Sequence, residues 1–283
     1  MAAHAAWAAP LVRLSGMMAL PTLLTLRTPR AAEDVARVGQ AACPAGSRGC
    51  KGFEGADCGH VAACGWEAYC SDILGFIRQQ RRGAYWNVYY EDLAVFLAEH
   101  GATQVVEVGT GWGGLASRLL DIATLNLTVV DPFLVGYSKG DHTSDTFEGL
   151  GDLLGLTPEA FAEAYAQAMD YDLGSSRGSA CRYRILRKAS PGAAESFEEG
   201  SLDAVFIDGL HTYSGVLEDL QAWGSRLRSG GLLIGNDYGD ERFPGVQRAF
   251  DEYAKSIPGS LHAGGVTLVR TIGNPHHHNV YIE

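Results

Sequence analysis

The sequence predicts a doubly wound α/β fold, and three observations support this prediction. Short apolar segments rich in β-branched residues alternate along the chain with longer segments whose apolar residues recur at helical spacing. Glycines are abundant, at 36 of 283 residues, and they gather at the turns between these segments. Hydrophobic residues make up 46% of the chain and charged residues 19%, so a packed core is expected. Because strands that alternate with helices form parallel sheets, we expect a mostly parallel sheet.

The first β-α-β unit lies between residues 91 and 131. A helix is expected over Glu91–His100, and Gly101 follows it as a cap. The segment Gln104–Gly109 is short, apolar and β-branched, which predicts a buried strand. A glycine-rich turn and an amphipathic helix come next, and they lead to a second buried strand at Leu127–Asp131. Units of this kind build parallel sheets with right-handed crossovers.

The same alternation continues toward the end of the chain. Further strands are expected at Arg182–Leu186, Asp203–Asp208, Leu232–Ile234, Gly265–Thr271 and Asn279–Ile282. Helices are expected over Val216–Trp223 and Pro244–Ala254, and Gly230-Gly231 is interpreted as the turn before the fifth strand. The expected sheet therefore has seven strands, is mostly parallel and ends in an antiparallel closing strand.

The chain divides into three segments. Residues 85–283 hold the alternating pattern and are expected to form the folded domain, residues 36–84 form a cysteine-rich N-terminal extension, and residues 1–35 form a targeting or disordered segment. Within the domain, residues 132–181 form a long insert between the second and third strands, with a helix at Pro158–Met169. Inserts of this length over a sheet edge are often lids or substrate walls.

The N-terminal segment has the composition of a targeting peptide. No acidic residue precedes Glu33, whereas arginines occur at positions 13, 27 and 30, and alanine is frequent. This composition resembles an organelle transit peptide. The run Met17–Leu26 fits the apolar region of a secretory signal instead, and an unstructured tail is the third interpretation.

The cysteines cluster in the N-terminal extension, where five of the six occur: Cys43, Cys50, Cys58, Cys64 and Cys70. Their spacing contains no C-x-x-C pair, which argues against a zinc knuckle. Glycine and alanine dominate between them, so disulfides would be needed to order the segment. We therefore expect a disulfide-stapled segment in the secretory pathway or an organelle lumen. A loose linker with reduced thiols, in a chloroplast or mitochondrion, is the alternative.

The net charge and the distribution of apolar residues argue against nucleic-acid binding and against a membrane span. The net charge of −11 repels phosphate backbones, so nucleic acid is not an expected partner. No run of apolar residues reaches the 18 or more that a membrane span requires. We therefore expect neither nucleic-acid binding nor a membrane span. The oligomeric state is left open by the sequence.

A glycine-rich motif follows the first predicted strand and indicates cofactor binding. It reads Val106-Glu-Val-Gly-Thr-Gly-Trp-Gly-Gly114, and Asp131 ends the next strand. A strand that runs into glycines and then a helix lets the backbone approach a ligand closely. Gly109, Gly111 and Gly114 also satisfy the G-x-G-x-x-G dinucleotide fingerprint, so the motif alone leaves the cofactor open.

The spacing Glu107-x-Gly109-x-Gly111-x-Gly113 resembles the first motif of class I S-adenosylmethionine (SAM)-dependent methyltransferases. That family has a Rossmann-like fold. The resemblance implies that Glu107 helps to hold the methionine end of SAM and that Asp131 accepts hydrogen bonds from both ribose hydroxyls. The acid at position 107 weighs against an NAD-dependent oxidoreductase, whose fingerprint does not need it.

Two later motifs resemble a branch of small-molecule O-methyltransferases that includes the catechol and macrocin types and related sugar-modifying enzymes. They are residues 207–213 and 230–238, and the resemblance covers about residues 90–260. It implies that Asp208, Asn236 and Asp237 bind a divalent cation. Three oxygen ligands favour a hard cation such as Mg²⁺.

The motif departs from many relatives at Asn236, where they carry an acid. The family also has metal-free members that use a histidine in this region, so His211 is a candidate general base beside Asp208, which is otherwise interpreted as a helix N-cap. The expected function is methyl transfer from SAM to a hydroxyl of a small-molecule or sugar acceptor, with Asp208 and His211 as catalytic residues. A non-catalytic SAM-fold module is the main alternative.

Overall fold

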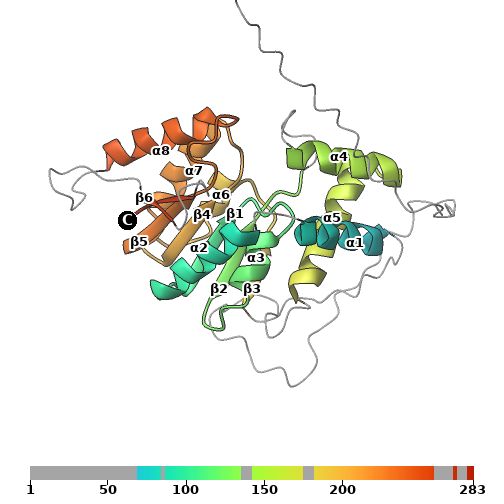
Figure 1. Ribbon diagram of the computed structural model, residues 1–283, viewed down its shortest axis with the longest axis horizontal. Helices are drawn as coiled ribbons and strands as arrows, with labels where there is room; N and C mark the ends of the chain where they lie inside the picture. Colours follow the sequence, from blue (N-terminus) through green and yellow to red (C-terminus); the bar gives the residue numbers. More distant parts are fainter. Residues whose placement is uncertain (1–68, 84–86, 135–141, 175–181, 258–269, 273–278) are drawn as a thin grey trace, which may run out of the picture. The chain divides into compact units, whose positions relative to one another are not determined.

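The computed structural model describes residues 69–83, 87–134, 142–174, 182–257, 270–272 and 279–283 (Figure 1). The segment 1–35, the cysteines of the extension before Cys70, and Cys181 lie outside these residues. None of the described helices is both long enough and apolar enough to span a membrane.

Seven strands form one sheet within the described residues. They are β1 (Gln104–Val108), β2 (Asn126–Val130), β3 (Tyr183–Leu186), β4 (Leu202–Ile207), β5 (Leu227–Gly235), β6 (Arg270–Thr271) and β7 (Val280–Ile282). Their order is β3-β2-β1-β4-β5-β7-β6, and β7 runs antiparallel to both of its neighbours. The predicted doubly wound, mostly parallel sheet with an antiparallel closing strand is therefore confirmed.

Eight helices are described: α1 (Tyr69–Gly83), α2 (Asn87–Glu99), α3 (Gly114–Leu119), α4 (His142–Leu154), α5 (Pro158–Gly174), α6 (Ser190–Ala194), α7 (Tyr213–Gly224) and α8 (Pro244–Ser256). Side chains alternate along a strand, so each strand supplies both faces of the sheet. Val105 and Phe206 pack with α2 and α3 on one face, whereas Val106 and Val205 pack with α6, α7 and α8 on the other. Helices therefore cover both faces, which makes the sheet a buried layer.

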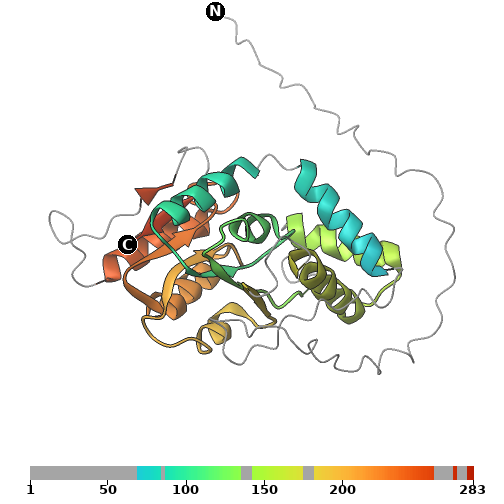
Figure 2. The same ribbon diagram turned by 90° about the horizontal axis from the view of Figure 1, so that it is seen from below.

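The remaining helices, α1, α4 and α5, form a group of their own in both views (Figure 2). Both α4 and α5 belong to the insert after β2. Ile73 and Ile77 of α1 are fully buried and belong to the same hydrophobic core as α2, α3 and one face of the sheet. The packed unit therefore begins no later than Tyr69, ahead of the boundary at residue 85 expected from the sequence.

Strand β5 begins earlier than the sequence predicted. It starts at Leu227, so Gly230 and Gly231 lie inside the strand instead of forming the turn that precedes it. Gly230 has a φ of 70°, and the pairing of β4 with β5 shifts its register between Leu202 and Ala204. The glycine pair therefore marks an irregularity within a strand, which is a common use of glycine in sheets.

Candidate functional site

A cavity of about 510 Å³ opens at the carboxyl edge of the sheet, and the loops after β1, β2, β4 and β5 contribute to its walls. The chain runs from β1 outward through β2 and β3 on one side, and through β4 and β5 on the other. The strand order therefore reverses between β1 and β4, and doubly wound sheets bind ligands at such a switch point. Leu134 and Leu210 lie at the rim, with 57% and 39% of their surfaces exposed.

The glycine-rich loop after β1 lies directly against the end of β4. A Cβ added to Gly109, whose φ is 79°, would sit 2.1 Å from the carbonyl oxygen of Asp208. The backbone N–H of Asp208 in turn donates to the carbonyl of Val108, at 2.8 Å. Gly111 and Gly113 also have positive φ values, of 46° and 67°. The loop conformation and the close approach both explain why glycine occupies these positions.

Glu107 lies behind this loop with 2% of its surface exposed. The hydroxyl of Thr110 donates to its carboxylate, with Oγ1 and Oε2 separated by 3.2 Å. Burial raises the pKa of Glu107 to about 8, with nearby Asp208 and Asp131 adding to the rise and with Thr110 and Arg81 opposing it. Burial therefore favours the protonated form of this carboxyl group, and a cationic ligand beside it would favour the ionised form.

Asp131 ties the loops after β1 and β2 together. Its Oδ2 accepts a hydrogen bond from the backbone N–H of Thr110 at 3.0 Å, and its Oδ1 accepts one from Phe133 at 2.6 Å. Burial raises its pKa, and these two hydrogen bonds oppose the rise. A carboxylate offers about four lone-pair positions, so two backbone donors still leave acceptor capacity on the cavity side.

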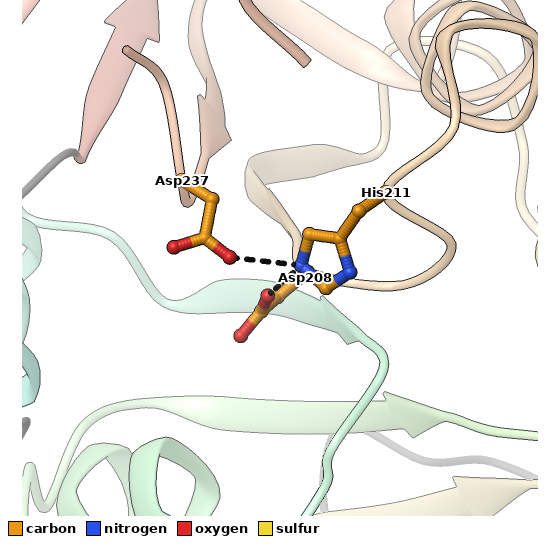
Figure 3. Close-up of side chains that lie close together, drawn as sticks. All are labelled: Asp208, His211 and Asp237. Atoms are coloured by element: carbon orange, nitrogen blue, oxygen red, sulfur yellow. Dashed lines mark hydrogen bonds and ion pairs between the residues drawn. The ribbon is translucent and has the colours of Figure 1, made fainter. Parts of the chain in front are cut away.

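Three side chains from the ends of β4 and β5 converge in the cavity (Figure 3). The Nε2 atom of His211 lies 3.2 Å from Oδ1 of Asp208 and 3.0 Å from Oδ2 of Asp237. One ligand atom from each residue lies within 4.8 Å of the others, which is compact enough to hold a metal ion. The ring of His211 stacks on Phe243, with centroids 4.4 Å apart. Burial raises the pKa of Asp208, whereas its hydrogen bond with His211 lowers it.

Of the three predicted metal ligands, two converge on the possible metal site and one lies beside it. Asp208 and Asp237 face a common point together with His211, which had been expected as a base. Asn236 lies beside them and donates its Nδ2 to Oδ1 of Asp208 at 3.3 Å. The interpretation of Asp208 as a helix N-cap is wrong, because Thr212 caps α7 by accepting a hydrogen bond from the N–H of Gly215.

Two further residues of the cavity wall were not among the predicted site residues, although the aromatic cluster of Tyr85, Trp86, Tyr89 and Tyr90 allowed substrate stacking as the lesser alternative to core packing. Tyr90 of α2 lines the cavity, and its pKa is raised well above the usual value by burial and by the nearby acids Asp208, Glu107 and Asp237. Arg81 of α1 also lines it. The aromatic run over residues 85–90 is the only sequence signal for Tyr90, and such runs are usually core.

In a comparison with known protein families, residues 106–238 match a family model described as a methyltransferase domain. No curated protein matches the chain. Similar solved structures include a protein from Corynebacterium glutamicum (17% identity, TM-score 0.42, covering 75% of this chain and 88% of that one). A TDP-rhamnose 3′-O-methyltransferase of calicheamicin biosynthesis has 11% identity and a TM-score of 0.47, and the match covers 75% of this chain and 93% of that one. The O-methyltransferase NovP has 19% identity and a TM-score of 0.45, and the match covers 70% of this chain and 78% of that one.

Proposed function

We propose that this chain is a class I SAM-dependent methyltransferase, an inference supported by the match of residues 106–238 to a methyltransferase domain. In this proposal it methylates a hydroxyl group of a small-molecule or sugar acceptor with the help of a divalent cation. One observation supports this most directly. The glycine loop, where the family motif implies SAM binding, abuts the residue that begins the Asp208–His211–Asp237 cluster. A methyl donor on the loop and an acceptor at the cluster would therefore be neighbours, and proximity is a large part of such catalysis.

The residues present fit a divalent cation. A neutral imidazole carries at most one proton on Nε2, yet this atom faces two carboxylate oxygens within 3.2 Å. Two carboxylates and an imidazole held this close are a common donor set for divalent metals. We infer that Asp208, His211 and Asp237 would hold the ion and that Asn236 orients Asp208. When bound there, a cation would supply Lewis acidity that lowers the pKa of a coordinated hydroxyl.

The transfer needs few other groups from the protein. The acceptor oxygen forms a bond to the methyl carbon while the carbon–sulfur bond breaks, and the sulfur keeps the electron pair as S-adenosylhomocysteine. The hydroxyl proton passes to solvent. Asp131 would hold the ribose and Glu107 would favour the positively charged end of SAM. Because one donor is an imidazole, Mn²⁺ should bind at least as well as the Mg²⁺ expected from oxygen ligands alone.

The test combines turnover, SAM binding and direct observation of the ion. Product formation is followed by mass spectrometry over a panel of phenols and sugars, and SAM binding by calorimetry. Chelation should abolish turnover and leave SAM binding intact, and Mn²⁺ or Mg²⁺ should restore activity. Pulsed electron paramagnetic resonance of the Mn²⁺-loaded protein should show coupling to an imidazole nitrogen, which His211→Gln removes. Asp237→Ala should lose Mn²⁺ binding, whereas Asp152→Ala, on the exposed side of α4, should not.

Other outcomes would redirect the proposal. Full activity in excess chelator, together with near-complete loss in His211→Ala, would reject the cation and leave His211 as a base oriented by Asp208. The loss expected for such a base is roughly 10²–10⁴-fold. SAM binding without turnover on any acceptor would favour a non-catalytic module. Tight binding of NAD(H) in place of SAM would favour an oxidoreductase.

A further inference from the structure

Arg81 lies ahead of the methyltransferase domain in the sequence, yet it lines the same cavity. It sits near the end of α1, and its Nε donates to the carbonyl oxygen of Trp112 in the glycine loop. Its Nη1 donates to Oδ2 of Asp172 on α5. The Arg81 side chain keeps 15% of its surface exposed, and that of Asp172 keeps 7%. A helix outside the domain thus brings a fixed positive charge to the loop.

The charges around the cavity make this arginine unusual. Six acids line the cavity: Asp131, Asp208, Glu218, Asp219, Asp237 and Asp240. Among the described lining residues, the permanently positive side chains are Arg81 and Arg242. Arg242 is 68% exposed and pairs with Asp240 at 2.6 Å. Arg81 is therefore the more enclosed of the two, and it lies beside the glycine loop.

SAM carries charges of both signs at its methionine end. Its sulfonium and α-ammonium groups are positive and suit an acidic cavity, whereas its α-carboxylate would be repelled there. When the α-carboxylate of SAM is enclosed in this cavity, it needs a cationic hydrogen-bond donor. The planar guanidinium group of arginine matches a carboxylate in geometry. The Nη2 atom of Arg81 lies over Gly113, where an added Cβ would be only 2.5 Å away. The guanidinium also lowers the pKa of Glu107, the residue that the family motif assigns to the methionine end of SAM, so the two side chains lie near each other.

We propose that Arg81 binds the α-carboxylate of the cofactor's methionine moiety and that Asp172 is the residue that positions it. This inference rests on the proposed function. Asp172 receives two guanidinium groups on its two oxygens, Arg78 on Oδ1 at 2.8 Å and Arg81 on Oδ2. Arg81 lies on α1, ahead of the residues that the family model matches, whereas Asp172 lies on α5, in the insert within them. Cofactor binding would thus depend on a residue outside the matched domain.

Paired ligands provide the test. S-adenosylhomocysteine has the carboxylate, and its decarboxylated analogue lacks only that group. Calorimetry measures both dissociation constants in the full chain and in Arg81→Gln, Arg81→Lys and Arg78→Gln. The selectivity for S-adenosylhomocysteine over the analogue should fall about tenfold or more in Arg81→Gln, as expected for a lost charge-assisted hydrogen bond. The selectivity of Arg81→Lys should lie between those of the parent and Arg81→Gln. Arg78→Gln replaces the more exposed partner of Asp172 and should keep the parental selectivity.

The ratio of the two constants is the decisive readout, because partial unfolding of a variant weakens both ligands equally. An unchanged ratio in both Arg81 variants would overturn the inference and reduce Arg81 to a structural tie. Failure of the unaltered chain to bind either ligand would instead count against the proposed function. The two failures are therefore distinguishable in one set of titrations.

Discussion

Glu107 links the stability of the ligand-free protein to pH. Its pKa in the folded chain is about 8, against 4.5 for an unperturbed glutamate. Between these values the folded state holds a proton that the unfolded state has released. Stability therefore falls as pH rises through this window, since the free energy of unfolding decreases wherever the native state binds more protons. Cofactor binding would recover part of this cost, because the positive end of SAM favours the ionised carboxylate.

Replacing Glu107 with Gln should remove this dependence. The amide keeps the size of the side chain but has no proton to lose in the window. We expect the variant to be more stable than the parent at pH 8 and its advantage to shrink toward pH 5, as measured by urea unfolding of the ligand-free protein. SAM binding should weaken in the same variant. Glu91→Gln, at an exposed position of α2, is the control, and parallel pH profiles for all three proteins would contradict the assignment.

The site residues that can be predicted from the sequence are those that lie beside a recognisable strand. Glu107 lies near the end of β1, and Gly109 and Asp131 directly follow β1 and β2. These strands are recognisable by composition, so the place of the three residues at one edge of the sheet follows from the fold class. Arg81 and Tyr90 reach the cavity from helices that precede the first strand. Nothing local distinguishes an arginine that turns inward from one on a solvated helix face, so only the packing of α1 reveals its position.

Helix α3 is only six residues long and begins at the end of the glycine loop. Its other end is held by Arg182, just before β3. The guanidinium donates to the carbonyl oxygens of Leu120 at 2.6 Å, Ile122 at 2.8 Å and Leu125 at 3.2 Å. Leu120 is the C-cap residue of α3, whereas Ile122 and Leu125 lie in the segment that leads to β2, and a cation at this end of a helix suits the helix dipole.

Removing this cap should destabilise the fold measurably. Arg182→Met keeps much of the side-chain volume but removes all three of these hydrogen bonds, although the carbonyl of Ile122 keeps the N–H of Leu125 as a donor. We expect the free energy of unfolding to fall by roughly 2–4 kcal/mol in denaturant titrations. Arg118→Met removes only an exposed ion pair with Asp121 at 3.9 Å and should cost less than about 1 kcal/mol. Equal losses in the two variants would show that Arg182 contributes no more than a surface charge.

The elements also show where sequence patterns lose their power. The alternation of strands and helices that defines the sheet was predictable, because buried strands and amphipathic helices differ in period. Helix α4, in the insert, was not anticipated, and β5 was expected to begin after its glycine pair. A glycine pair indicates a turn in most contexts, and only the register shift against β4 explains why this one stays within a strand.

For the molecule as a whole, the N-terminal helix decides where the stable unit begins. Residues 36–84 were assigned to an extension because glycine, alanine and cysteine dominate most of that segment. Yet α1 buries Ile73 and Ile77 completely, and burial of one isoleucine contributes about 1.5–3 kcal/mol. The average composition of residues 36–84 does not reveal that a single amphipathic helix, α1, lies at the end of this segment.

Two truncations should therefore behave differently. A chain that begins at residue 64 keeps α1 and serves as the reference, and it should unfold at a clearly higher temperature than one that begins at residue 85. A chain that begins at residue 85 loses the two isoleucines and leaves Asp172 buried without Arg78 and Arg81, so it should be strongly destabilised or insoluble. Thermal unfolding followed by circular dichroism makes the comparison. Equal melting temperatures would place the boundary at residue 85 after all.

The contact between Gly109 and the carbonyl of Asp208 has a practical consequence for redesign. Because no side chain fits between them, a substitution in the glycine loop or at the end of β4 would disturb both segments. Under the proposed function, acceptor preference is therefore better altered at Leu134 and Leu210. Both lie at the rim and are already exposed, so exchanging them should cost little stability, and a library confined to these two positions would test new acceptors without altering the glycine loop or the Asp208–His211–Asp237 cluster.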